Sequence, residues 1–131
     1  MLKERIEEVT RANEDFYSAF ESLDIMRMDG VWAHQEYVTC IHPGWSIRVG
    51  WPLVRDSWVV IFNNVFSMGF SLTELQVQVA GDDLAWVICT ENITSRHGDK
   101  NQNSRVVATN LFERLSGSWK MIHHHGSPLM E

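Results

Sequence analysis

The chain has 131 residues, of which 44% are hydrophobic, and six Trp and six Phe are among them. This length and composition suit a single compact domain with one core, which we expect to span residues 1–131. Asp and Glu total 17 against 11 Lys and Arg, for a formal net charge of −6. Such an acidic chain lacks the basic face that nucleic-acid phosphates or an anionic membrane surface would require.

The apolar runs are much shorter than the roughly 20 residues of a membrane-spanning helix. The first residues also lack the apolar stretch of a signal peptide, so we expect a soluble, cytoplasmic protein. Cys40 and Cys89 both lie in apolar, strand-like surroundings. Two such thiols are more typical of reduced core residues than of a disulfide, which fits the same compartment.

Helical periodicity dominates the first half of the chain. Apolar residues recur at spacings of three, four and seven from Lys3 to Leu23, which predicts a long amphipathic helix. Asp24 can cap a short second helix that continues to Trp32. A third helix is expected from Gly50-Trp51-Pro52 onward, because proline is well tolerated in a first helical turn.

The second half changes to the alternating pattern of strands. After a short strand over residues 36–42 and an extended piece over 45–49, four strands are predicted in succession, at residues 70–79, 84–94, 104–115 and 119–126. Their connections carry Gly, Asp and Asn, and the one at residues 97–103 is expected to be a long, mobile hairpin tip. Helices followed by a meander predict an α+β fold, with the helices on one face of an antiparallel sheet.

Three consecutive histidines end the last predicted strand. Alternation from Trp119 and Met121 would place His123 and His125 on the inner face and His124 on the outer face. A buried imidazole needs hydrogen-bond partners, so this strand predicts a polar pocket within an apolar shell.

The outer face of the predicted sheet also carries large apolar side chains. Trp86, Ile88, Leu111 and Ile122 would remain in water if nothing covered them. We therefore expect a homodimer that forms through this outer face.

Several stretches, taken in order, resemble the SnoaL-like branch of the nuclear transport factor 2 (NTF2) and ketosteroid isomerase superfamily. They are residues 16–20, 28–32, 40–44, 50–58, 108–114 and 119–125. The resemblance implies a cone-shaped, cystatin-like fold in which three N-terminal helices pack on a curved antiparallel sheet and enclose a cavity. It also implies that this cavity takes a small ligand of apolar or mixed polarity.

Placed on such a cone, ten residues are expected to line the cavity. They are Tyr17, Trp32, His42, Trp45, Trp58, Phe62, Glu91, Asn110, His123 and His125. Four tryptophans form either a ligand wall or plain core, namely Trp32, Trp45, Trp51 and Trp58. His42 either points into the cone mouth or bonds the local turn.

The candidate catalytic residues are Glu91, His42, His123 and His125. A carboxyl group in an apolar setting has a raised pKa suited to proton transfer, although a structural ion pair would explain Glu91 equally well. A His-x-His pair could hold zinc with His42 as a third ligand, but the usual zinc motifs are lacking, so we expect no metal and no other cofactor.

Three functions remain open. The first is an isomerase, cyclase or hydrolase in which Glu91 or a histidine acts as general base while Tyr17 or Asn110 polarises an oxygen. The second is a metal-free enzyme similar to the iota-class carbonic anhydrases, whose His-His-His-Ser-Ser ending the segment His123 to Ser127 resembles except at Gly126. The third is a non-catalytic dimeric module for ligand binding or protein association.

Overall fold

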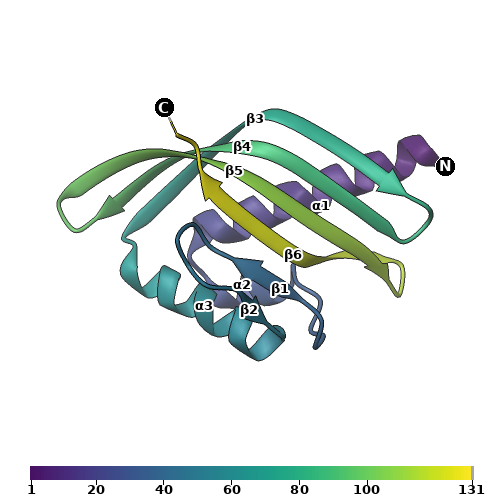
Figure 1. Ribbon diagram of the computed structural model, residues 1–131, viewed down its shortest axis with the longest axis horizontal. Helices are drawn as coiled ribbons and strands as arrows, with labels where there is room; N and C mark the ends of the chain where they lie inside the picture. Colours follow the sequence, from purple (N-terminus) through teal and green to yellow (C-terminus); the bar gives the residue numbers. More distant parts are fainter. Residues whose placement is uncertain (131) are drawn as a thin grey trace.

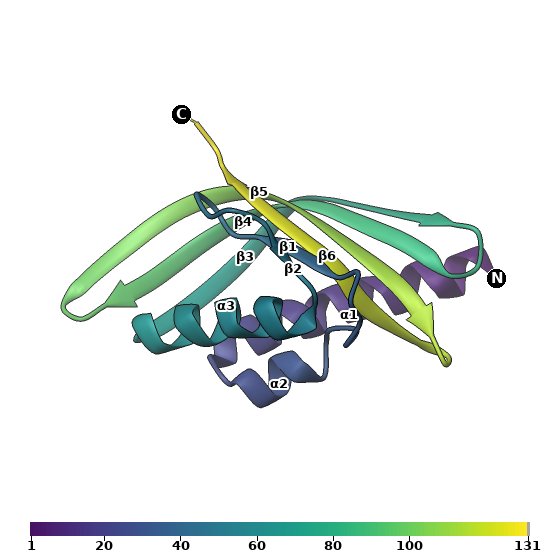
Figure 2. The same cartoon turned by 60° about the horizontal axis from the view of Figure 1, so that its bottom comes forward.

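The computed structural model describes residues 1–130 and contains three helices and six strands. The helices are α1 (Leu2–Ser22), α2 (Ile25–Asp29) and α3 (Trp51–Asn64). The strands are β1 (Thr39–Ile41), β2 (Arg48–Val49), β3 (Ser67–Ala80), β4 (Leu84–His97), β5 (Lys100–Leu115) and β6 (Ser118–Pro128). All three helices lie on one side of a strongly curved sheet (Figures 1 and 2), which confirms the predicted α+β cone.

The sheet is ordered β2-β1-β6-β5-β4-β3. Strands β3 to β6 form the expected antiparallel meander. At the other edge, β1 pairs with β6 in parallel, so the sheet is antiparallel except at this junction. The parallel pair brings the end of β1, and with it the following His42, next to the histidines of β6.

The second helix is shorter than predicted. Asp24 caps it by accepting a hydrogen bond from the Met26 amide at 2.9 Å, but the helix ends at Asp29. Beyond it, the backbone of Val31 and Ala33 hydrogen-bonds to Met121 of β6. Sheet pairing thus replaces the helix that apolar spacing had predicted as far as Trp32.

The predicted seven-residue hairpin tip was wrong. β4 continues to His97 and β5 begins at Lys100, so only Gly98 and Asp99 form the turn. Gly98 has a φ of 61°, a conformation that glycine adopts without steric cost, and this allows the polar strand ends to pair up to the turn. The long hairpin carries the rim of the cavity described below.

The core lies between the helices and the concave face of the sheet. Phe16 and Phe20 of α1 pack edge-on against Trp58 of α3, with ring centroids 5.7 and 4.7 Å apart. Cys40 and Cys89 are both buried in this core as free thiols. Within residues 1–130, no helix is both long and apolar enough to cross a membrane.

A β-bulge in β6 determines which histidine faces the core. Phe112 of β5 pairs with Met121, but the residue before it, Leu111, pairs with His123. Ile122 therefore has no partner in β5 and is an extra residue. An extra residue shifts the alternation of every residue after it to the other face. His124 therefore points inward, opposite Asn110, and the two neighbouring histidines point outward.

Candidate functional site

A cavity of about 600 Å³ lies between α3 and the concave face of the sheet. Its walls are largely apolar and include Phe20, Trp45, Ile61, Met68, Ile93 and Val106. The polar groups His42, Glu91 and His124, which we call the inner triad, line it with only 2–3% of their surface exposed. The rim is polar and more exposed, with Asn64, Gln102 and Ser104 among its residues.

Glu91 reaches the cavity from the middle of β4. Val87, Cys89 and Glu91 share the inner face of this strand, as the alternating pattern predicted. The Tyr17 hydroxyl donates a hydrogen bond to Glu91 Oε2 at 2.5 Å. Burial raises the pKa of Glu91 to about 7, and the hydrogen bond from Tyr17 opposes part of that shift. The carboxyl group is therefore poised to take up or release a proton near neutral pH.

Tyr17 remains a protonated phenol next to this carboxyl group. Burial, and then the charge of Glu91, raise the pKa of Tyr17 far above its usual range. Because its single proton is directed at Glu91, the hydroxyl can only accept a further hydrogen bond. That bond comes from Asn110 Nδ2 at 3.2 Å.

Asn110 connects Tyr17 to His124. Its Nδ2 donates to Tyr17 and to Asn13 Oδ1, the latter at 2.9 Å, and its Oδ1 lies 2.6 Å from His124 Nδ1. An amide oxygen can only accept, so His124 Nδ1 carries the hydrogen and Nε2 carries the lone pair. Burial, and then the nearby His42, lower the pKa of His124 well below its usual value, so the imidazole is neutral.

His42 is oriented in a similar way by Ser57 of α3. Ser57 donates its hydroxyl hydrogen to the Val54 carbonyl at 2.6 Å, so its Oγ accepts from His42 Nε2 at 2.8 Å. The lone pair of His42 therefore resides on Nδ1. Burial lowers the pKa of His42 to about 4, which keeps this ring neutral as well. The His42 and His124 ring centroids are 6.3 Å apart.

The predicted inward placement of His123 and His125 was wrong. His123 lies on the outer face, where its Nδ1 is 2.6 Å from Thr39 Oγ1, and His125 is exposed on the same face. Burial and the neighbouring His125 lower the pKa of His123. The cause is the extra Ile122, which the alternating pattern of the sequence did not reveal.

The aromatic residues divide between the cavity and the core. Trp45 lines the cavity, whereas Trp32 and Trp58 are fully buried in the core and Phe62 packs against Trp58. Trp58 nevertheless supports the site, because its ring lies edge-on to His42 with centroids 4.6 Å apart. Tyr17 and Asn110 do not line the cavity but stand directly behind its polar groups.

Sequence reasoning missed Asn13 and Ser57. Asn13 lies four residues before Tyr17 on α1, and Ser57 lies next to Trp58 on the buried side of α3. A small polar residue on an otherwise apolar helical face is a detectable signal, because a buried polar group requires a partner. Within residues 1–130, no three His, Cys, Asp or Glu side chains are arranged to hold a metal ion.

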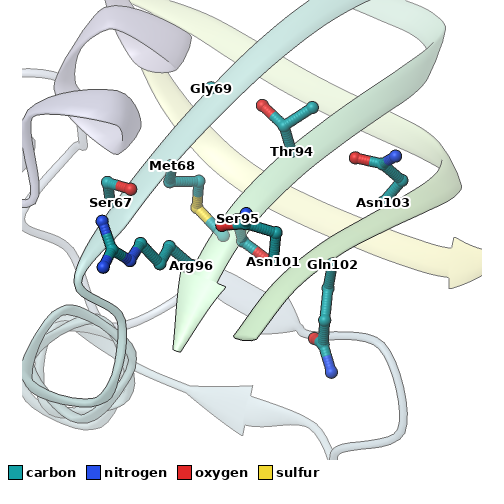
Figure 3. A pocket seen from close by; sticks show the side chains of 9 residues that line it. All are labelled: Ser67, Met68, Gly69, Thr94, Ser95, Arg96, Asn101, Gln102 and Asn103. Atoms are coloured by element: carbon teal, nitrogen blue, oxygen red, sulfur yellow. The ribbon is translucent and has the colours of Figure 1, made fainter. Parts of the chain in front are cut away.

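A second hollow, of about 520 Å³, lies at the far end of β3, β4 and β5 (Figure 3). Thr94, Asn103, Arg96 and Gly69 border it. Arg96 is the one charged residue among those that line it, and none of them belongs to the inner triad. Of these two cavities, only the first is lined by Glu or His side chains.

Comparison with known proteins places this geometry in a family. The model of the SnoaL-like domain matches residues 9–131. The chain belongs to the SnoaL-like domain family. A crystal structure of a candidate dehydratase from the NTF2-like family of Streptomyces avermitilis is 36% identical, covers all of both chains and has a TM-score of 0.93.

Two further proteins are similar to this SnoaL-like domain. A ketosteroid isomerase-like protein from Erwinia carotovora shares the fold, with 20% identity, 98% coverage of both chains and a TM-score of 0.82. F-box protein SKIP8 of Arabidopsis thaliana is 26% identical over 122 residues, which are 93% of this chain and 50% of the relative. The chain thus spans about half the length of that curated relative.

Proposed function

We propose that this SnoaL-like domain is a proton-transfer enzyme for a small, mainly apolar molecule, with Glu91 as its general base. The observation that carries the proposal is the placement of Glu91. Its carboxyl group lines the cavity, accepts a hydrogen bond from the protonated Tyr17 phenol and has a pKa that burial raises to about 7. A base is most effective when its pKa lies near the working pH. A purely structural carboxylate would not need to line the cavity.

The proposed step needs no external oxidant or reductant. Glu91 takes a proton from a carbon next to a carbonyl group, and the C–H electron pair moves toward the carbonyl oxygen. The protonated Glu91 then returns the proton to another carbon, which is isomerisation, or to a departing hydroxyl group, which gives water. The similarity to a candidate dehydratase and to a ketosteroid isomerase-like protein supports reactions of this kind.

Tyr17 and Asn110 take a different part from the one that the sequence suggested. The Tyr17 hydrogen is directed at Glu91, and the Asn110 Nδ2 hydrogens are directed at Asn13 and Tyr17, so neither residue has a hydrogen left to polarise a substrate oxygen. We assign them as positioning residues. Tyr17 orients Glu91, and Asn110 sets the tautomer of His124.

Deuterium exchange tests the proposal without knowledge of the natural substrate. Cyclohexanone, its β-hydroxy derivative and a β,γ-unsaturated cyclohexenone would be incubated with the protein in deuterium oxide and followed by proton NMR. Glu91→Gln should slow exchange, dehydration or isomerisation by at least about 100-fold. Glu36→Gln, which neutralises an exposed glutamate, is the matched control. Turnover that survives Glu91→Gln would contradict the proposal, and turnover lost on chelation and restored by zinc would contradict its metal independence.

The carbonic anhydrase-like alternative gains less support. Only His124 of the three histidines faces the cavity, and Ser127 pairs with Val107 on the outer side of the sheet. Gly126 occupies the remaining position of that motif, and an added Cβ there would lie only 3.0 Å from Val106 Cγ1.

A second candidate, an association module, is favoured by one observation. The chain is 29% identical to a candidate calcium/calmodulin-dependent protein kinase type II association domain from Thiobacillus denitrificans, with 91% and 93% of the two chains covered and a TM-score of 0.75. Mass spectrometry of gently purified protein separates the two functions. A co-purified small molecule supports the cavity function, and an empty, partner-bound assembly supports association.

A further inference from the structure

The direction of the hydrogen bonds made by the two imidazoles of the inner triad indicates the class of ligand. His42 and His124 are neutral rings, and in each the protein has already used the N–H hydrogen. Ser57 receives the hydrogen of His42 Nε2, and Asn110 receives that of His124 Nδ1. Both rings line the cavity, so each brings a lone pair, not a hydrogen, to a ligand.

The protein itself satisfies these lone pairs poorly. Among residues 1–130, His124 Nε2 has no hydrogen-bond partner, and the one polar contact of His42 Nδ1 is with Cys40 Sγ at 4.0 Å. A thiol is a weak donor, and 4.0 Å is a long contact. A ligand that fills the inner end displaces water from these nitrogens, so it has to supply hydrogens of its own or leave two buried acceptors unpaired.

The charge of the inner triad restricts the class of ligand further. Both imidazoles are neutral, and Glu91 is largely protonated below about pH 7. Around these groups the walls are Phe20, Ile93 and Val106. An ammonium group would thus be buried without a permanent opposite charge, which is costly, whereas a hydroxyl group is neutral and donates.

We infer that the cavity selects a neutral ligand whose inner polar groups are hydroxyl donors, such as a diol, an enol or a phenol, over a ligand with carbonyl or ether acceptors alone. The inference deepens the proposed function, because it rests on the same cavity. A substrate of this class carries hydroxyl groups on an apolar frame beside the carbon from which Glu91 takes the proton. The two imidazoles then fix its orientation.

A pair of ligands with the same ring tests this selectivity. Resorcinol presents two hydroxyl donors, and its dimethyl ether keeps the ring but presents acceptors alone. Tryptophan fluorescence titration should show resorcinol binding at least about tenfold more tightly, which corresponds to one well-formed hydrogen bond. Equal or tighter binding of the dimethyl ether, or no saturable response to resorcinol up to its solubility, would overturn the inference.

Nitrogen NMR of protein labelled at histidine tests the same inference in the unmodified chain. Neutral His42 should carry its hydrogen on Nε2 and neutral His124 on Nδ1, and resorcinol should shift the resonance of the unprotonated nitrogen in both rings. The opposite tautomers, or stoichiometric zinc on those nitrogens, would overturn the inference. His124→Phe should reduce the preference for resorcinol, with His125→Phe on the outer face as control.

The outcomes also separate this inference from the proposed function. Glu91→Gln removes the proposed base but leaves both imidazoles, so it should abolish turnover while retaining the preference for resorcinol. Retained turnover in this variant would contradict the function alone. A lost ligand preference in the wild-type chain would contradict the inference alone.

Discussion

Glu91 combines burial with a strong hydrogen bond, and the two act on its pKa in opposite directions. Burial prevails, so the folded chain holds the proton more tightly than the unfolded chain, in which an ordinary glutamate titrates near 4.5. Stability contributed by this group is fully present below about pH 4.5 and is lost as the pH rises through about 7. The contribution of His42 has the opposite pH dependence, because its pKa falls from 6.5 to about 4 on folding. Stability contributed by this group is present above about pH 6.5 and is lost as the pH drops through about 4.

Glu91→Gln should therefore change the pH dependence of unfolding. The variant cannot titrate at this position, so its free energy of unfolding should rise relative to wild type by on the order of 3 kcal/mol between pH 4.5 and pH 7 or above. Chemical denaturation of both proteins across this pH range measures the difference. A constant difference would show that Glu91 keeps an ordinary pKa in the folded state.

His124 and His125 are adjacent in sequence, but His124 is buried and His125 is exposed. His124→Phe should destabilise the fold by roughly 1–3 kcal/mol, because Asn110 Oδ1 loses its donor in a buried site. His125→Phe, the same substitution on an exposed side chain, should leave stability almost unchanged. Urea unfolding of the two variants provides the comparison, and equal losses would place both rings in similar surroundings.

At the scale of the element, the alternating pattern was sufficient for β4 and β5 and failed for β6. Glu91 and Asn110 face inward as predicted, because pairing between these two strands continues without interruption from Leu84 to His97. In β6, Ile122 fits the alternating pattern but is a bulge residue, and nothing in its side chain reveals this. The pairing with β5 and β1 selects the register, which is a property of three strands and not of one segment.

Gly126 shows how tightly the end of β6 is packed. A Cβ at this position would lie 3.0 Å from Val106 Cγ1 and 3.3 Å from Pro43 Cγ. Gly126→Ala should destabilise the fold by about 1–3 kcal/mol, because Val106 and the proline ring have to move. Gly30→Ala is the control, since a Cβ there meets only the Arg27 carbonyl at an ordinary 3.5 Å. Thermal unfolding of the pair measures the effect, and equal stability would mean that the strand end adapts freely.

At the scale of the whole molecule, the order of helices and strands could be predicted because each element carries its own local signal. The long amphipathic α1, the Asp24 cap, the early proline of α3 and the meander each appear in the sequence. The inner triad could be predicted only in part, because it depends on how β1, β4 and β6 meet. His42 and Glu91 were identified as site residues, whereas His124 was assigned to the wrong face.

At the scale of the whole molecule, we propose that the outer face of the sheet is the surface on which a second copy packs. Trp86, Ile88 and Leu111 are only partly buried there, and Trp86 pairs with Leu111 across β4 and β5. Partly exposed side chains of this size lose their contact with water when two sheets pack face to face, and this burial of apolar surface favours a dimer. The histidines that the bulge turns outward, His123 and His125, lie on the same face.

Leu111→Glu should therefore convert a dimer into monomers. A carboxylate in the middle of an apolar interface would lose its hydration without gaining a partner, whereas in a monomer it remains in water. Leu53→Glu is the matched control, because Leu53 lies on α3 and is already 55% exposed. Analytical ultracentrifugation at micromolar concentration should show a dimer for wild type and Leu53→Glu and a monomer for Leu111→Glu. A monomeric wild-type chain would mean that water covers this face, and dissociation by Leu53→Glu instead would place the interface on the helices.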